Sequence, residues 1–209
     1  MDYEYSDRVF ENILKETNKW EKEFYQTSIF KKFNKTKKED TKLILPLVPD
    51  FMYSYYLRRP KDWTATALEE MLLDLFPRKL VVDDGFYKNV EPVLTAYFNY
   101  LQDTGRIKNS EALISRLKRV APLMLVASKE SQNWGAGKQI ANFAEELGFD
   151  LSDEKSIQSY MDMINNGIMP LQKDSREKKT GQFNHPCSCG SGKNFSDCHG
   201  GDVMEFPSS

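Results

Sequence analysis

The residues best suited to chemistry in this chain are gathered close to its C-terminal end. All of its cysteines, Cys187, Cys189 and Cys198, lie there, and His199 follows the last of them directly. Thiolates and imidazole are ligands that Zn²⁺ prefers, and four of them complete its tetrahedral shell. A full shell leaves no position for a catalytic water. The set therefore predicts a structural zinc site.

A disulfide fits these cysteines less well than a metal ion does. A bond between Cys187 and Cys189 would be strained, because side chains two positions apart in an extended chain diverge, and the third cysteine would be left over. His185 competes with His199 for a ligand position. It precedes Pro186, however, whose ring holds the preceding backbone extended, and this favours a place in a linker.

The residues between the predicted ligands suit a tight metal-binding loop. Only one residue separates the first two cysteines, so Gly190 and Gly192 must supply the backbone freedom that wraps the ion. Lys193 is close enough in sequence to offset the negative charge of the thiolates. Phe195 is the one large apolar residue of the loop and is expected to form its floor.

The run PCSCGSGKNFSDCHG at 186–200 resembles the SEC-C motif, the zinc-binding tail of the bacterial preprotein translocase motor SecA. The family pattern C-x-C-x₈-C-[C/H] is matched at every ligand position. The resemblance implies a docking module that contacts another protein, such as an acidic export chaperone, or the ribosome, through the loops around Lys193 and Phe195. Further lysines that the family usually carries are replaced by Asn194, Ser196 and Asp197.

Composition limits the remaining function classes. The 209-residue chain has a net charge of −2, whereas a dedicated nucleic-acid binder typically carries a basic surplus. No stretch is apolar enough to span a membrane, and the first residues lack the basic start and apolar run of a signal peptide. Thiolate zinc ligands fit a reducing compartment. We therefore expect a cytoplasmic protein.

The rest of the chain predicts one helical domain, over residues 1–170, joined to the zinc module. Residues 171–185 are polar and of mixed charge, which predicts a flexible linker. The zinc module at 186–200 is then followed by a short tail at 201–209. The expected fold is all-α, an irregular multi-helix bundle with a small C-terminal zinc knuckle.

Apolar residues at helical spacing define the expected helices. These cover residues 7–25, 49–58, 64–76, 92–101, 110–121, 135–147 and 152–166, and only residues 79–82 look strand-like. Prolines set several boundaries: Pro46 and Pro49 should divide the apolar window that contains them, and Pro122 should break or kink its helix. Gly135 and Gly137 are expected to form a helix-start turn, since GAGK lacks the length of a phosphate-binding loop.

The helical domain shows no obvious catalytic group. Thr66 and Glu69 predict a capping box at a helix start. Adjacent carboxylates on a helix face different directions, so we interpret them as solvated surface. These pairs are Glu69 with Glu70, Asp83 with Asp84, and Glu145 with Glu146. Both histidines and all cysteines lie near the zinc module, so the domain is not expected to be an enzyme.

Two features leave a nucleic-acid-binding regulator of phage or mobile-element type as the alternative. The lysines of residues 31–38 alternate with Phe30 and Phe33, although we favour a solvated connector held by these two rings. Residues 135–166 have the outline of a helix-turn-helix, but the second helix is acidic and would repel phosphate. The regulator would be favoured if two basic groups shared one face, Lys31, Lys32, Lys35, Lys37 and Lys38 with Arg58, Arg59 and Lys61.

The leading hypothesis is a zinc-binding adaptor in which the helical domain contacts one partner. The zinc module would dock onto another protein or the ribosome, in a secretion- or chaperone-related role. The nucleic-acid regulator is the alternative, and a helical enzyme of unknown activity comes third.

Overall fold

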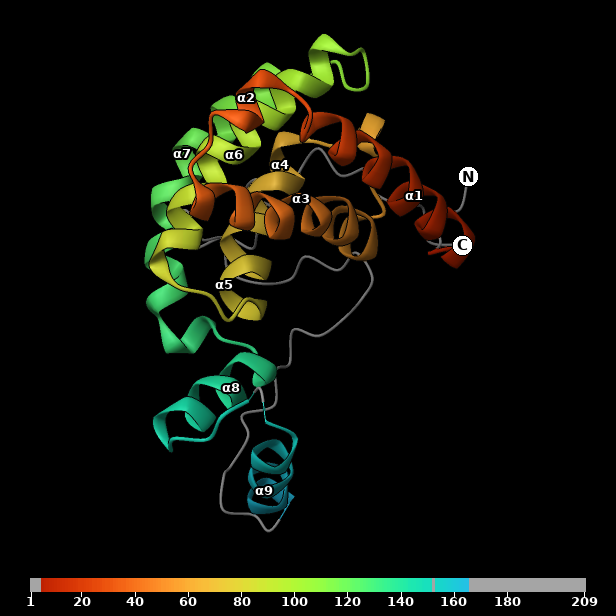
Figure 1. Cartoon of the computed structure of the whole chain (residues 1–209). Coiled ribbons are helices and arrows are strands. Elements are labelled where there is room, and N and C mark those ends of the chain that lie inside the picture. The colour runs from red at the N-terminus through yellow and green to blue at the C-terminus, as the bar shows by residue number, and fades with distance from the viewer. Residues whose placement is uncertain (1–4, 152, 166–209) are drawn as a thin grey trace, which may run out of the picture.

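The computed structural model describes residues 5–151 and 153–165, and all regular structure within them is helical (Figure 1). The elements, in chain order, are α1 (Asp7–Phe24), α2 (Ser28–Lys31), α3 (Lys35–Tyr56), the 3₁₀ turn η1 (Pro60–Asp62), α4 (Ala65–Glu70), the π-helical turn η2 (Met71–Leu75), α5 (Phe76–Lys79), α6 (Asp84–Asp103), α7 (Ser110–Lys129), the 3₁₀ turn η3 (Ser131–Asn133), α8 (Ala136–Glu146) and α9 (Glu154–Asn165). The all-α prediction is confirmed for this part of the chain. The predicted linker, zinc module and tail lie outside the described residues.

The elements α1 to α7 form a helical body around one apolar core. Figure 1 shows α3 across its middle, with α1 on one side and α6 and α7 on the other. Leu45 and Met52 of α3, Leu94 and Phe98 of α6 and Val120 of α7 are all fully buried there. The two residues of α3 are seven positions apart and those of α6 are four apart, which places each pair on one face of its helix. That face meets the core.

The first helix belongs to this core. Its buried residues, Ile13, Thr17, Trp20, Glu21 and Phe24, recur at the three- and four-residue steps that place side chains on one face. That face packs on α3. The amphipathic helix predicted over 7–25 is confirmed.

The predicted break at Pro46 and Pro49 is wrong, because α3 continues through both prolines. A proline inside a helix removes one backbone hydrogen bond and crowds the preceding turn. Burial of Ile44, Val48 and Phe51 on the same segment offsets that cost, since fully burying one such side chain stabilises the fold by about 1.5–3 kcal/mol. Tertiary packing has overridden local propensity here.

Two further helices also run through a proline. α6 begins at Asp84, well before the predicted start at Pro92, because Asp83 caps it: the Asp83 Oδ1 accepts a hydrogen bond from the Phe86 N–H at 2.8 Å. α7 begins at Ser110 as predicted and remains helical through Pro122 to Lys129.

The segment from 64 to 82 differs from prediction in three respects. The helix cap is Thr64, whose hydroxyl accepts from the Ala67 N–H at 3.2 Å, and not the predicted Thr66, which is buried. A wider π-helical turn then follows, and the helix ends at Lys79. The strand-like residues 79–82 form no strand, since no neighbouring strand exists among the described residues to pair with them.

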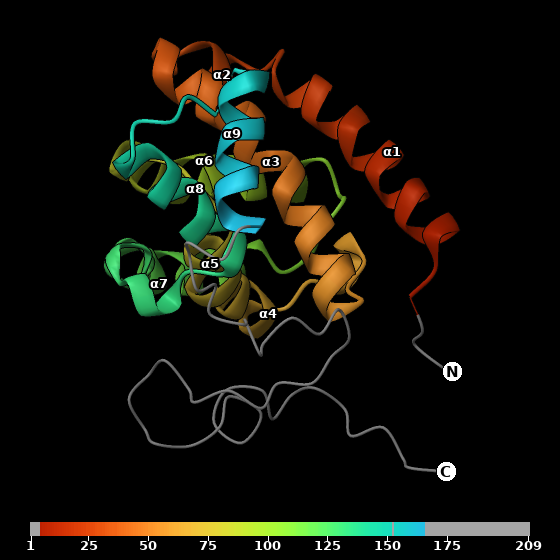
Figure 2. The ribbon, with the colours of Figure 1, turned by 90° about the horizontal axis from the view of Figure 1, so that it is seen from below.

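The last described elements, α8 and α9, pack on each other as a helical hairpin, which Figure 1 shows below the body and Figure 2 shows from beneath. Gly135 is the N-cap of α8, as the predicted helix-start turn requires. Gly148 has a φ of +79°, a conformation that glycine adopts at little cost, and it ends the helix as predicted. The Tyr160 hydroxyl of α9 donates to the Ile140 carbonyl at 2.6 Å and so joins the two helices.

Candidate functional site

The predicted zinc ligands and contact residues lie outside the described residues. They are Cys187, Cys189, Cys198 and His199, with Lys193 and Phe195 between them. Within the part of the chain that the structure describes, no group of three or more histidine, cysteine or acidic side chains is placed to hold a metal ion. The zinc site therefore stays a prediction from ligand type and spacing.

The described part holds a second candidate, a groove of about 520 Å³ between α1 and two turns of the body. One wall is a stripe of α1, namely Val9, Asn12, Ile13, Glu16 and Trp20. The other wall is formed by residues 59–61 and 105–106, which follow α3 and α6. We call this site the basic groove, because three of its lining side chains are cationic and one is anionic.

Left-handed residues at two helix ends build the second wall. After α6, Gly105 has a φ of +70°, and the Arg106 N–H donates to the Leu101 carbonyl at 2.8 Å. Together with the bond from the Gly105 N–H to the Gln102 carbonyl, this is a Schellman motif, which satisfies carbonyls left open at a helix end. After α3, Leu57 takes a similar turn with a φ of +53°. The negative ends of both helices favour the cations that follow them.

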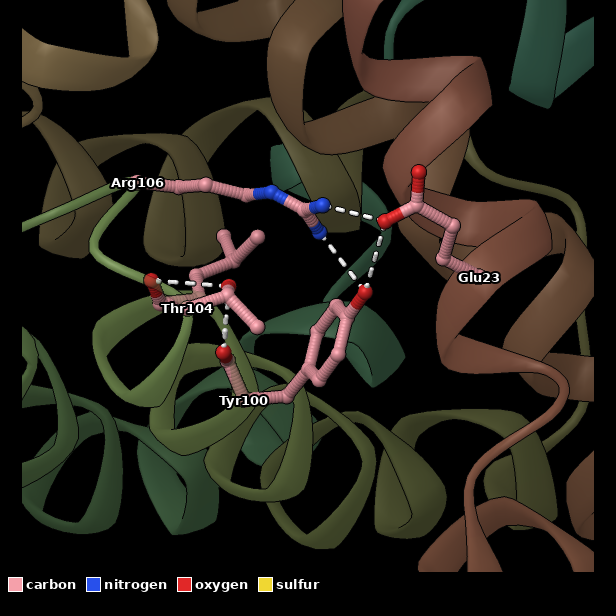
Figure 3. A network of polar contacts seen from close by, with 5 residues as sticks. Glu23, Tyr100, Thr104 and Arg106 are labelled. Carbon is pink, nitrogen blue, oxygen red and sulfur yellow. Dashed lines mark hydrogen bonds and ion pairs between the residues drawn. The ribbon is translucent and has the colours of Figure 1, made fainter.

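Arg106 is held by a network that joins two helices (Figure 3). Its guanidinium donates to the Tyr100 hydroxyl on α6 at 2.7 Å and forms an ion pair with Glu23 on α1. The Tyr100 hydroxyl donates in turn to the Glu23 carboxylate at 3.2 Å. The guanidinium also lies over the Trp20 ring, 5.3 Å from its centroid, which is cation–π geometry. We call these residues the Arg106 network.

The network changes the proton affinity of its members. The hydrogen bond from Arg106 lowers the pKa of Glu23. For Arg106, burial opposes the charge, but the bonds to Glu23 and Tyr100 outweigh it and raise its pKa. The side chain thus stays cationic at the edge of the groove, with more N–H donors than the two partners use.

A buried ion pair joins α4 to α7 and corrects one sequence interpretation. The sequence predicts Glu69 and Glu70 on the surface, yet both are 5% exposed. The Glu69 carboxylate forms an ion pair with Arg116 and lies 3.7 Å from the guanidinium of Arg119. Ion pairing offsets the cost of burying this charge. The other two acidic pairs are exposed, as expected.

The structure separates the two basic groups whose clustering would have favoured a nucleic-acid regulator. Residues 31–38 run from the end of α2 into the first turn of α3, and residues 58–61 follow the end of α3. Because a helix rises 1.5 Å per residue, the groups are about 30 Å apart. Phe30 is buried and Phe33 packs on the core, as expected for a connector held by these rings. Lys37 lies over the Phe33 ring, 5.5 Å from its centroid.

Sequence reasoning missed a buried lysine of the hairpin that contacts the body. Lys138 of α8 is 5% exposed, and its Nζ donates to the Pro77 carbonyl at 2.9 Å and to the Ser128 carbonyl at 3.3 Å. It also lies 5.1 Å from the centroid of the Trp134 ring. Burial lowers the pKa of Lys138 to about 8. The lysine of the GAGK run thus binds main-chain oxygens of the protein itself. A comparison of the sequence with phosphate-binding loops does not indicate this role.

Arg106 was missed as well, although its position can be read from the chain. The run Thr104, Gly105, Arg106 after an apolar helix is typical of a Schellman end, which places a cation next to the helix terminus. Its partner Glu23 lies far away in sequence and carries no such pattern.

No family model, curated protein or solved structure matches the chain. No helix in the described ranges is both long enough and apolar enough to cross a membrane. Function is therefore inferred from the chain's own residues.

Proposed function

We propose that this chain is a zinc-binding adaptor that docks onto another protein or the ribosome. The observation that carries the proposal is the spacing of Cys187, Cys189, Cys198 and His199, a complete and closed ligand set for Zn²⁺. A closed shell supports a structural role for the metal, in which it shapes a loop for contact. Lys193 and Phe195 would lie on that loop.

The all-α body supports the adaptor arrangement, since it offers surfaces for a partner apart from the metal. The basic groove is one such surface, lined by residues far from the cysteines in sequence. Two weak contacts on one chain act as a single stronger one, because binding at the first raises the local concentration of the second.

Metal content tests the ligand assignment. The purified full chain should contain about one zinc ion per molecule, the stoichiometry of one four-ligand site. The change His199→Ala should lower zinc affinity, whereas the matched change His185→Ala should leave it unchanged. Metal analysis after gel filtration, with competition by a chelator, measures both. Loss of zinc from the His185 variant alone would overturn the assignment.

Docking is tested separately with the metal site disabled. The intact chain should sediment with purified bacterial ribosomes or retain a defined protein partner at salt near physiological strength. A chain with Cys187→Ser and Cys198→Ser should lose that contact while the helical body unfolds at the same temperature. Equal binding by both chains would refute the docking role and leave zinc binding intact.

A further inference from the structure

The basic groove has the lining of a site for a specific class of ligand. We infer that it binds an acidic peptide segment that also carries apolar side chains. The inference stands on the helical body alone and goes beyond the proposed zinc module, so either can fail without the other.

The charge of the lining favours an anionic ligand. Arg59 and Lys61 are exposed, and among the described residues neither forms an ion pair. Arg106 adds a third cation, held in place by the Arg106 network, in which its ion pair with Glu23 offsets part of its charge (Figure 3). Glu16 is the one acidic side chain of the lining. A chain with a net charge of −2 thus concentrates positive charge in one concave place, which attracts anions.

Shape and polarity indicate a peptide rather than a bare anion. The half-buried side chain of Val9 offers the groove apolar surface for an aliphatic side chain, and the buried Ile13 and Pro60 form the floor beneath it. Asn12 is exposed on the α1 wall, and its amide can both donate hydrogen bonds to a peptide backbone and accept them from it. The volume of about 520 Å³ lies within the usual range of ligand pockets, about 300–1,000 Å³.

The same lining disfavours single-stranded nucleic acid. Such binders stack bases on exposed aromatic rings. Trp20 is the one aromatic ring of the groove, but it is 9% exposed, and Arg106 covers one face. Glu16 on α1 would also repel a phosphate backbone, whereas a peptide can place an apolar or amide group beside it.

A binding titration tests the inference on the full-length chain. The probe is a short fluorescein-labelled peptide of alternating glutamate and leucine with blocked ends, followed by fluorescence anisotropy. Saturable binding is expected, and the double change Arg59→Gln with Lys61→Gln should weaken it about fivefold, because each exposed ion pair contributes modestly. Both side chains are exposed, so the fold should be retained, as circular dichroism checks.

The matched control carries Lys31→Gln with Lys32→Gln, an equal charge change on exposed residues at the end of α2, beside the far end of α3. It should alter binding less than twofold, a change within the weak effect of distant surface charge. Equal losses in the two double variants would show attraction by net charge alone and overturn the site. So would equal binding of the glutamine–leucine peptide, absence of saturable binding, or tighter groove-dependent binding of oligothymidylate.

Discussion

The two ends of the described chain are attached to the body in different ways. α1 is attached mainly by apolar side chains, since Trp20 and Phe24 belong to the core cluster. The hairpin of α8 and α9 contributes no residue to that cluster. Its polar contacts with the body include the bonds from Lys138 to two main-chain oxygens and to the Tyr87 hydroxyl, and a bond from the Gly135 N–H to the Arg78 carbonyl.

The contrast separates two kinds of stability. Burial of large rings is non-directional and ties α1 to the cooperative unfolding of the whole body. Hydrogen bonds from one amine are directional and modest in net energy, about 0.5–1.5 kcal/mol each. The hairpin should therefore open locally while the body remains folded, whereas α1 should not.

The largest expected effect is the loss of Phe24. This ring is fully buried and lies 5.3 Å from the ring of Tyr97. The change Phe24→Ala should lower the free energy of global unfolding by about 3–5 kcal/mol, as for other buried aromatic residues. Urea denaturation measures it. The matched hairpin change Phe149→Ala removes a half-buried ring near Tyr160 and should leave global unfolding nearly unchanged. A similar loss of global stability in both variants would show that the hairpin unfolds together with the body, as α1 does.

A smaller and local effect is expected at Lys138. The change Lys138→Met keeps the chain length but leaves the Pro77 carbonyl without its donor, at a cost of about 1–3 kcal/mol. Hydrogen exchange should speed up in α8 and α9 and stay unchanged in α6. The exposed lysine of α9 supplies the control, since Lys155→Met should change neither region. Faster exchange throughout the body would show that the hairpin is part of its cooperative unit.

The two attachments should also respond to pH with opposite sign. Burial raises the pKa of Glu21 on α1 from its ordinary value of 4.5 to about 7, despite a hydrogen bond with Tyr25 that lowers it. The folded chain thus holds this proton more tightly, and stability should fall as pH rises from about 4.5 to 7. Burial lowers the pKa of Lys138 from 10.5 to about 8. The unfolded chain holds that proton more tightly, so hairpin attachment should strengthen from about pH 8 to 10.5.

The variants Glu21→Gln and Lys138→Met isolate these contributions. Each should remove its own pH dependence when the stability of the variant is subtracted from that of the parent chain at every pH. One pKa unit corresponds to about 1.4 kcal/mol, which sets the scale of both effects. A difference curve of the opposite slope at either site would contradict the direction of the pKa shift assigned to it.

The smallest effects are expected at two glycines of the hairpin. Gly148 has a φ of +79°, so Gly148→Ala should destabilise the hairpin by about 1 kcal/mol. Gly137 lies within α8 with open space around it, so Gly137→Ala should stabilise it by about 0.5–1 kcal/mol. Hydrogen exchange of α9 amides reports both. Together the two variants test whether residues of the hairpin itself set its stability. The contrast with α1 requires this, because α1 should unfold only with the body.

Local patterns predicted the helices well where helix ends depend on nearby residues. The start at Ser110 and the turns at Gly135 and Gly148 are confirmed because each follows from backbone chemistry within a few positions. The breaks expected at Pro46 and Pro49 failed because distant core contacts outweigh a local cost.

The candidate sites also differ in whether their residues are close together in the sequence. The zinc ligands are close in sequence, so their chemistry can be recognised from spacing alone. The basic groove unites residues 59–61 with 105–106 and a stripe of α1, and no spacing rule connects them. The burial of Glu69 was missed for the same reason, since its partner Arg116 lies on another helix.

The contact of Lys138 with carbonyl oxygens has a consequence for how this protein tolerates change. The Pro77 and Ser128 carbonyls belong to the main chain, which every residue type supplies. Substitutions of Pro77 or Ser128 that keep the backbone path should therefore leave these two bonds in place, whereas few substitutions at position 138 should. In these two bonds the accepting residues can change type during evolution, whereas the donating residue must remain a long side chain with an N–H donor.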